Sequence, residues 1–336
     1  MLIANRTIGN FLKPYIIAEV SCNHGGDLRT ALELIEAARW AGASAVKFQA
    51  YTPDTITLDC NKPDFIIQDG LWKGKTLYDL YKKAHTPFEW FPKLFKEAEK
   101  VGIPIFSSVF DRSSVDMLDA LGCPAFKIAS MELVDTPLIA YAARRGKPLI
   151  ISTGMGSKQD ISEAHKAVGT TPVAFLHCTS EYPQTVEWSD LQGIHRLRSI
   201  VGDGIPVGVS DHTPGNMIVS IAATAMGAAI IEKHLKPLAS TGTEDDEFSL
   251  DPDMFKTMVE LVDTAYEAVQ QREFTSNPSR QLRRSLYAVI DIEEGESFTE
   301  TNVRSIRPGF GIAPKHLPRL LGKRADKAYR KGDRIT

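Results

Sequence analysis

Short apolar runs rich in β-branched residues alternate with helical stretches along most of this chain. The runs end abruptly in polar residues, whereas the stretches between them carry alanine and leucine at helical spacing. The predicted strands are Tyr15–Val20, Ser44–Gln49, Ile103–Ser108, Ala125–Ser130, Pro148–Gly154, Pro172–Thr179, Val207–Thr213 and Ala228–His234. The predicted helices cover residues 27–41, 87–101, 113–121, 136–146, 158–168, 189–200, 215–227 and 252–271. This alternation predicts a (β/α)₈ TIM barrel, because a doubly wound open sheet would usually have a glycine-rich first turn, which is absent.

Two segments do not fit the alternation. Residues 51–86 form a long insertion rich in Asp, Lys, Tyr and Trp, placed after a strand, where a barrel builds a substrate lid. Residues 284–336 have turn signals and short strands but no long helical period, which predicts a small β-rich domain, marginal alone. We therefore expect a barrel domain over residues 1–271, a linker over 272–283 and the β-rich domain over 284–336.

Composition and charge exclude several classes of function. The chain has a formal net charge of −3 and a pI near 6.3, so it lacks the excess of basic residues that is typical of proteins that bind nucleic acid or an anionic membrane. No apolar run reaches the ~18 residues of a membrane span, and the N-terminus lacks the apolar core of a signal peptide. Four cysteines lie far apart, as is typical of reduced thiols in a cytoplasmic enzyme. We expect a cytoplasmic protein with no nucleic-acid or membrane partner.

Two histidines end consecutive predicted strands. His212 follows the run that begins at Val207, and His234 ends the next run, with a helix between them. Because the strands of a βαβ unit are parallel, both imidazoles are expected to face one pocket. Such a pair with open positions suits a borderline divalent metal such as Mn²⁺, with Mg²⁺ or Co²⁺ as alternatives. The other interpretation is that each histidine only caps its own strand.

Polar residues at the remaining strand ends are the other candidates for the site. Lys47 and Lys127 each stand between apolar residues, and a buried lysine is costly without an anionic partner. With the neighbouring hydroxyls they imply a small ligand that carries phosphate and carboxylate. Two alternatives stay open: each lysine pairs with a nearby carboxylate such as Glu19 or Glu132, or one forms a Schiff base.

Taken in order, the motifs of this chain resemble those of the sialic acid synthase family. The matching segments cover nearly the whole chain and include Glu19-Val-Ser-Cys-Asn-His-Gly, Val46-Lys-Phe-Gln-Ala-Tyr, Phe126-Lys-Ile-Ala-Ser-Met-Glu, Ser152-Thr-Gly-Met, Cys178-Thr-Ser-Glu-Tyr-Pro, Ser210-Asp-His-Thr and Ile231-Glu-Lys-His. Residues 284–336, with Arg307-Pro-Gly-Phe-Gly, resemble that family's antifreeze-like (SAF) domain. The segment that begins Tyr51-Thr-Pro-Asp is most similar to the pseudaminic acid synthases within the family.

The resemblance implies condensation of phosphoenolpyruvate with an amino-sugar aldehyde. For the pseudaminic members this is a 2,4-diacetamido-trideoxy-hexose of the L-altrose type, and the products are pseudaminic acid and phosphate. His212 and His234 would hold the metal, and Glu19 would transfer a proton or stabilise a cationic intermediate. The implied substrate-binding residues are Lys47, Gln49, Lys127, Ser130, Ser152, Ser180, Tyr182, Ser210, Asp245 and Arg307. The family also implies a domain-swapped homodimer in which Arg307 reaches the partner's barrel.

One segment departs from the family pattern. Where Gly-Pro-Asp-Ser-Ala-Phe is expected, this chain has Gly242-Thr-Glu-Asp-Asp-Glu-Phe248, so acidic residues surround Asp245. Two other functions therefore stay open. One is synthesis of N-acetylneuraminic or legionaminic acid from an N-acylated mannose-type sugar, and the other is non-catalytic carbohydrate binding.

Overall fold

The computed structural model describes residues 1–336 except 69–72, 180–182, 241 and 271–277. The chain divides into two compact units, Met1–Val269 and Gln270–Thr336, and each is described by itself. Half of the predicted linker 272–283, residues 272–277, lies outside the described part of the chain. No helix in the described ranges is both long and apolar enough to cross a membrane.

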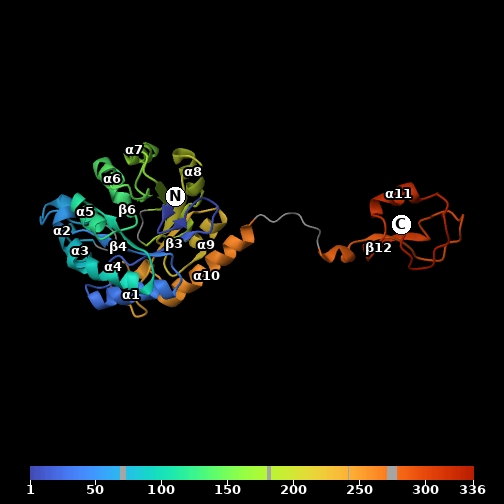
Figure 1. Cartoon of the computed structure of the whole chain (residues 1–336), viewed down its shortest axis with the longest axis horizontal. Coiled ribbons are helices and arrows are strands. Elements are labelled where there is room, and N and C mark those ends of the chain that lie inside the picture. Colours follow the sequence, from blue (N-terminus) through green and yellow to red (C-terminus); the bar gives the residue numbers. More distant parts are fainter. Residues whose placement is uncertain (69–72, 180–182, 241, 271–277) are drawn as a thin grey trace. The chain divides into compact units, whose positions relative to one another are not determined.

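Eight parallel strands close into a barrel in the first unit. They are β3 (Tyr15–Glu19), β4 (Ala45–Ala50), β5 (Ile105–Val109), β6 (Phe126–Ile128), β7 (Leu149–Ser152), β8 (Val173–His177), β9 (Val207–Asp211) and β10 (Ile230–His234). Their order around the barrel follows the chain, and β10 closes the barrel by pairing with β3. The prediction of a (β/α)₈ barrel is confirmed (Figure 1).

A helix follows each strand and covers the outside of the barrel (Figure 1). The helices are α1 (Leu28–Trp40), α4 (Phe91–Val101), α5 (Arg112–Ala120), α6 (Thr136–Ala143), α7 (Lys158–Val168), α8 (Gln192–Val201), α9 (Ile218–Ala225) and α10 (Pro252–Val269). Side-chain caps fix several starts: the Asp27 carboxylate accepts bonds from the first backbone N–H groups of α1. Helix α8 starts later than predicted, because Val186–Ser189 form a separate 3₁₀ turn.

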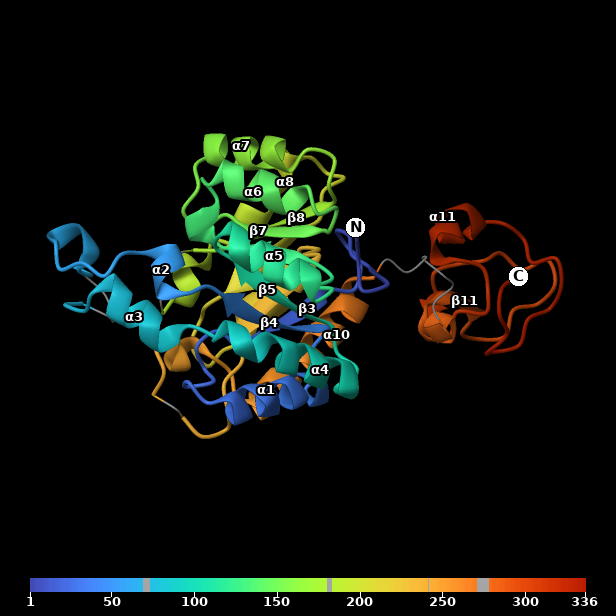
Figure 2. The same cartoon turned by 60° about the vertical axis from the view of Figure 1, so that its left-hand side comes forward.

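The insertion between β4 and α4 contains two short helices, α2 (Pro53–Ile56) and α3 (Leu77–Ala84). Figure 2 shows both helices together on one side of the barrel strands. A 3₁₀ turn, Pro63–Phe65, lies between them, and another, Phe88–Trp90, leads into α4. The insertion therefore has structure of its own beside the strand ends.

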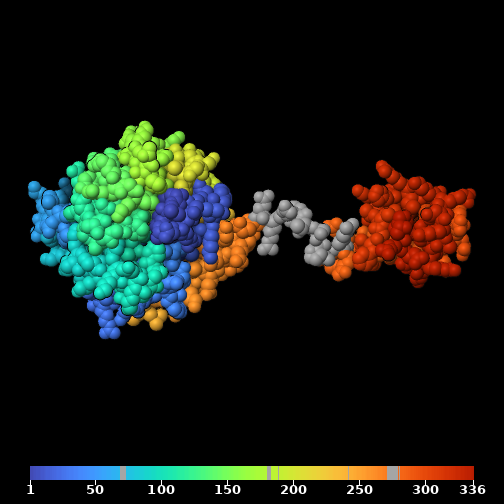
Figure 3. Space-filling view, in the orientation of Figure 1, coloured from blue at the N-terminus to red at the C-terminus, as the bar shows by residue number. Residues whose placement is uncertain are grey.

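The N-terminal segment forms a feature that the sequence pattern did not predict. A two-stranded hairpin, β1 (Leu2–Ile3) with β2 (Arg6–Thr7), carries Ile3 into the same hydrophobic core as the barrel strands. Lys13 forms an ion pair of 2.8 Å with Asp263 of α10. Figure 3 shows the N-terminal segment, in dark blue, against the surface of the barrel unit beside the orange α10.

The second unit has a small core of its own. Two antiparallel strands, β11 (Ser285–Ala288) and β12 (Val303–Ile306), pair over four residues, and a short helix, α11 (Leu317–Leu320), follows them. The core residues are Leu286, Ala288, Ile292, Phe298, Val303, Ala325, Tyr329 and Ile335. The short strands and the lack of a long helix agree with the β-rich domain expected here.

Candidate active site

A cavity of about 360 Å³ opens where the barrel strands end. Its floor is made by side chains from β3, β4, β5, β6, β7, β9 and β10, which parallel topology brings to one side of the barrel. Of the predicted site residues, ten line it: Glu19, Lys47, Gln49, Lys127, Ser130, Ser152, Ser210, His212, His234 and Asp245. Strand register alone places Glu19 beside both Lys47 and His234.

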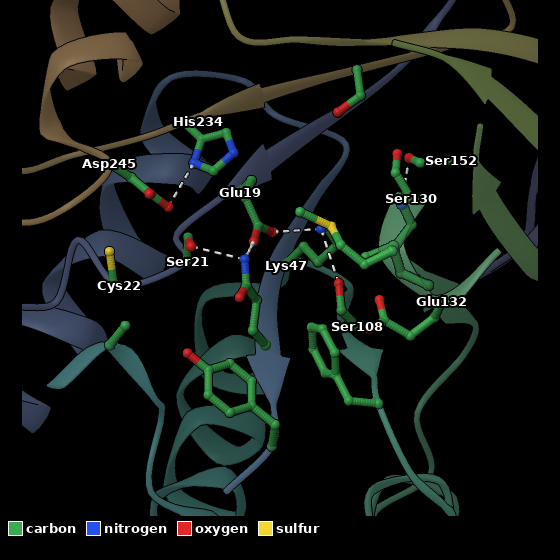
Figure 4. A pocket seen from close by; sticks show the side chains of 18 of the residues that line it. Glu19, Ser21, Cys22, Lys47, Ser108, Ser130, Glu132, Ser152, His234 and Asp245 are labelled. Carbon is green, nitrogen blue, oxygen red and sulfur yellow. Dashed lines mark hydrogen bonds and ion pairs between the residues drawn. The ribbon is translucent and has the colours of Figure 1, made fainter. Parts of the chain in front are cut away.

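A buried ion cluster lies at the centre of the cavity (Figure 4). The Lys47 ammonium is 2.9 Å from Glu19 Oε2 and 3.5 Å from Glu232 Oε2, and it donates a hydrogen bond of 3.2 Å to Ser108. Gln49 donates to the other Glu19 oxygen at 2.9 Å, and Ser210 donates to Glu232 at 2.9 Å. Lys47 pairs with Glu19, as one of the alternatives for this lysine predicts, and it also lines the cavity, so the pairing does not exclude contact with a ligand.

One ammonium between two carboxylates sets the proton affinities of the cluster. Burial would lower the pKa of Lys47, but Glu19 and Glu232 outweigh it and raise that pKa. Burial raises the pKa of Glu19, and the nearby Glu232 adds to the rise, whereas Lys47 opposes it. The pKa of Glu232 is lowered, because Lys47 and Lys127 outweigh the effect of burial. Glu19 is therefore the carboxylate of this pair that takes up a proton first.

Lys127 is held differently from Lys47. Its ammonium donates hydrogen bonds to Ser152 Oγ at 2.6 Å and to the Ile128 carbonyl at 2.8 Å. Burial lowers its pKa, and the nearby Lys47 adds to this effect, while Glu232 opposes it. Ser130 accepts a bond of 3.1 Å from the backbone N–H of Gly154 at the same end of the cavity. An anion here would find an ammonium, two hydroxyls and a backbone donor close together.

The paired histidines meet as the sequence predicts. The ring centroids of His212 and His234 are 5.4 Å apart. Burial lowers the pKa of His212 to about 4 and that of His234 well below its usual value, so both rings are neutral at neutral pH. Neutral imidazole is the form that binds a metal ion.

The residues present fit a divalent metal with open coordination positions. His234 Nδ1 is buried and makes no hydrogen bond within the described part of the chain; Asp245 Oδ2 stands 3.5 Å from it. No group of three or more His, Cys, Asp and Glu side chains among the described residues is arranged to hold a metal. The two imidazoles would therefore share the ion with a ligand or water.

Asp245 and the anion-binding side chains lie at opposite ends of the cavity. Figure 4 shows Asp245 and Cys22 on one side, Ser130, Ser152 and Glu132 on the other, and the Glu19–Lys47 pair between them. Burial raises the pKa of Asp245 to about 6, and the side-chain hydrogen bonds of Ser21 and Cys22 oppose the rise. A ligand with two different ends would fit this arrangement.

Three predicted residues are not placed in the cavity. Ser180 and Tyr182 lie outside the described residues, and Arg307 is exposed in the second unit. His24, in the loop after β3, is buried and does not line the cavity; its Nε2 is 3.1 Å from Thr86 Oγ1, and its ring is edge-on to Trp90. It joins the first strand-end loop to the end of the insertion.

Sequence reasoning gives Glu132 and Glu232 no role in catalysis or substrate binding: it treats Glu132 only as a partner for a buried lysine, and Glu232 only as a polar residue at a strand end. Glu132 lines the cavity with a buried Oε2 that makes no hydrogen bond in the described structure, and burial raises its pKa to about 7 while Lys127 opposes the rise. Glu132 stands two residues after Ser130 in the motif Phe126-Lys-Ile-Ala-Ser-Met-Glu, so the sequence could have indicated that it lies near the site. Glu232 stands two residues before His234, and the two-residue period of a strand puts both side chains on one face.

Comparison with known proteins identifies the family to which this chain is similar. The NeuB family profile matches residues 34–273, and the SAF domain profile matches residues 283–336. A pseudaminic acid synthase of Campylobacter jejuni is 43% identical over 338 residues, which cover 98% of each chain. One from Helicobacter pylori is 40% identical over 94% of each chain.

A solved structure has the same arrangement of the main chain. The N-acetylneuraminic acid synthetase of Leptospira borgpetersenii superposes with a TM-score of 0.73 at 30% identity, covering 84% of this chain and 93% of that one. The family match covers most of the barrel unit, and the SAF match covers residues 283–336 of the second unit, Gln270–Thr336. The chain therefore belongs to the NeuB family and carries a SAF domain at its C-terminal end.

Proposed function

We propose that this enzyme condenses phosphoenolpyruvate with a 2,4-diacetamido-trideoxy-hexose of the L-altrose type, giving pseudaminic acid and phosphate. The observation that carries the proposal is the two-ended cavity: Lys127 with Ser130 and Ser152 suits phosphate and carboxylate, and the histidine pair with Asp245 suits the aldehyde sugar. The choice of sugar is supported by identities of 40–43% to pseudaminic acid synthases, against 33% to a diacetyllegionaminic acid synthase of Legionella pneumophila.

The chain's own side chains account for the order of bond changes. Lys47, Lys127 and the serines, with Ser180 and Ser210 among them, hold phosphoenolpyruvate so that its C3 faces the aldehyde carbon. As the C–C bond forms, the aldehyde oxygen takes a proton from Glu19, whose pKa burial raises. Positive charge at C2 is stabilised by the Glu232 carboxylate. Water then adds to C2 and gives one proton to Glu132. Phosphate leaves by cleavage of the C2–O bond and takes up the Glu132 proton, while the new C2 hydroxyl returns its proton to Glu19 and becomes the keto oxygen.

A metal is part of the proposal. His212 and His234 would hold a divalent ion, with Mn²⁺ first and Mg²⁺ or Co²⁺ as alternatives. When bound, such an ion polarises a carbonyl group as a Lewis acid. Since phosphoenolpyruvate is the substrate and all four cysteines are unpaired, we place the enzyme in the cytoplasm.

Product analysis tests the proposed function directly. Purified protein with Mn²⁺, phosphoenolpyruvate and the diacetamido sugar should release one phosphate for each nine-carbon 2-keto acid found by mass spectrometry. N-acetylmannosamine and the legionaminic precursor serve as competing substrates. A higher kcat/KM with either competitor would replace the proposed sugar, and no phosphate release with any of them would support a carbohydrate-binding protein instead.

Removal of the metal should abolish turnover. Chelation should stop phosphate release, and Mn²⁺, Mg²⁺ or Co²⁺ should restore it, because the paired imidazoles leave positions open for substrate and water. His212→Ala and His234→Ala should lose activity at any metal concentration while circular dichroism shows an unchanged fold. Full activity in a chelated sample or in either variant would refute the metal assignment.

Glu132 should give the enzyme an ionisation near pH 7. Its pKa is raised to about 7, so below that pH the carboxyl is protonated and cannot accept a proton from water. We expect kcat/KM to fall about tenfold per pH unit below 7 in the wild type. Glu132→Gln should lower kcat/KM and abolish the fall in kcat/KM below pH 7 that this carboxyl causes. Any pH dependence that comes from phosphoenolpyruvate itself should remain in both proteins. The exposed Glu89 provides the control variant Glu89→Gln, and an unchanged fall in kcat/KM in Glu132→Gln would assign the ionisation elsewhere.

A domain-swapped homodimer is also proposed, on family resemblance and on the small core of the second unit. In it, Arg307 of one chain serves the barrel of the other. Lys127→Ala and Arg307→Ala proteins should each be inactive, but mixing them with subunit exchange should restore activity, because one site of each heterodimer carries neither lesion. No recovery after exchange has been confirmed by mass would refute the swap.

A further inference from the structure

One wall of the cavity is made of residues that the proposed bond changes do not use. This wall, called the insertion wall here, consists of Ile56, Leu80, Tyr81 and Ala84 from the insertion, with Tyr51 and Phe110 beside them. The carboxylate residue Glu244, from the segment after β10, lines the same cavity. The wall and Glu244 therefore form the part of the site that is free to select the substrate.

The insertion wall is apolar and well packed. The Tyr51 ring lies edge-on to Tyr81, with centroids 5.7 Å apart, and edge-on to Phe110 at 5.1 Å. Leu80 is buried, with 7% of its surface exposed. A methyl group placed against the carbon atoms of Ile56, Leu80 and Ala84 is stabilised by burial, whereas a hydroxyl in contact with the same carbon atoms would lose hydrogen bonds to water.

Glu244 is a buried carboxylate whose partners are two exposed lysines. Lys83 is 2.8 Å and Lys75 3.5 Å from Glu244 Oε1, and their side chains are 61% and 48% exposed while that of Glu244 is 7% exposed. Burial would raise the pKa of Glu244, but the hydrogen bond from Lys83 outweighs it and the pKa is lowered. Both lysines contact Oε1, so neither occupies Oε2. The side chain is thus a charged acceptor, fixed from the solvent side, in a cavity wall.

Glu244 lies near Tyr51 of the insertion wall, at the sugar end, whereas Tyr81 of the same wall, whose pKa is raised chiefly by burial, is close enough to Glu132 for its charge to add to the rise. The pKa of Tyr51 is raised chiefly by burial, and the charges of Asp245 and Glu244 contribute to the rise. Asp245 stands 3.5 Å from His234, on the opposite side of the cavity from Ser130 and Ser152 (Figure 4). Glu244 precedes Asp245 in the chain, at the place where family resemblance leads one to expect proline.

We propose that Glu244 determines sugar specificity by accepting the N–H of the second acylamino group, while the insertion wall receives the methyl groups of the sugar. An acylamino group offers an N–H donor next to a methyl, which matches a carboxylate next to an apolar wall. A sugar with a hydroxyl at that carbon lacks the methyl that seats the group against the wall, so its shorter O–H donor is not held against Glu244 and can donate to water instead. The inference rests on the proposed function and names the residues that would select its substrate.

Two sugars of the same configuration separate specificity from general damage. One is the 2,4-diacetamido-2,4,6-trideoxy aldose, and the other has a hydroxyl in place of the 4-acetamido group. Wild type should prefer the first by kcat/KM. Glu244→Gln should lose about tenfold or more with the first sugar and a few-fold at most with the second, since one charge-assisted hydrogen bond is removed. Glu247→Gln, an exposed glutamate of the same segment, should change neither.

A charge swap tests whether Glu244 acts only through its ion pair with Lys83, which connects the insertion to the segment after β10. The double variant Glu244→Lys/Lys83→Glu can re-form that ion pair but leaves the cavity without its carboxylate. The proposal predicts that the melting temperature recovers relative to Glu244→Lys alone, whereas the preference for the diacetamido sugar stays lost. Recovery of the preference for the diacetamido sugar in the double variant would show that the ion pair between positions 83 and 244, and not the carboxylate in the cavity, determines the preference.

The outcomes distinguish this inference from the proposed function. Wild-type turnover with an equal loss on both sugars in Glu244→Gln would overturn the specificity role and leave the synthase assignment intact. No phosphate release by wild type with either sugar would overturn the proposed function and this inference together. Selective loss on the diacetamido sugar would support both.

Discussion

The buried ammonium of Lys47 is the interaction on which the rest of the cavity depends. It lies on β4 and is held by carboxylates from β3 and β10, the two strands whose pairing closes the barrel. A lone buried cation would be costly, and either carboxylate alone would be equally costly, so the three groups stabilise one another only in this arrangement. The same arrangement fixes the proton affinities of Glu19 and Glu232 and places both beside the histidine pair.

The sequence predicts the parts of the site that follow from barrel topology. Polar residues at the ends of parallel strands must meet, and so Glu19, Lys47, His212 and His234 could be brought together without a structure. The same logic fails for Glu132, which lies on a turn after β6, and for the insertion wall, whose side chains follow no simple period. The N-terminal hairpin is too short for periodicity to reveal. The pKa values depend on burial, which no local pattern contains.

The cavity combines a fixed reactive floor with a wall that can vary. The floor is built on strands and holds its charges through short contacts, such as that between Lys127 and Ser152 at 2.6 Å. The variable part of the cavity consists of the insertion wall and Glu244, which belongs to the segment after β10. The ion pair of Glu244 with Lys83 connects that segment to the insertion. The proposed selection of the sugar by Glu244 and the insertion wall would let this chain keep one reaction while its sugar preference changes, because the proposed bond changes use other residues.

A double-mutant cycle on Lys47 and Glu19 tests the central claim most directly. Lys47→Met, Glu19→Gln and the double variant are compared with wild type by the free energy of unfolding in urea. Removing the ammonium alone should cost about 3 kcal/mol, because two carboxylates remain buried. The double variant should be more stable than the sum of the single losses predicts, with a coupling free energy of about 2 kcal/mol. Strictly additive losses would contradict the account, because the two groups would then not depend on one another.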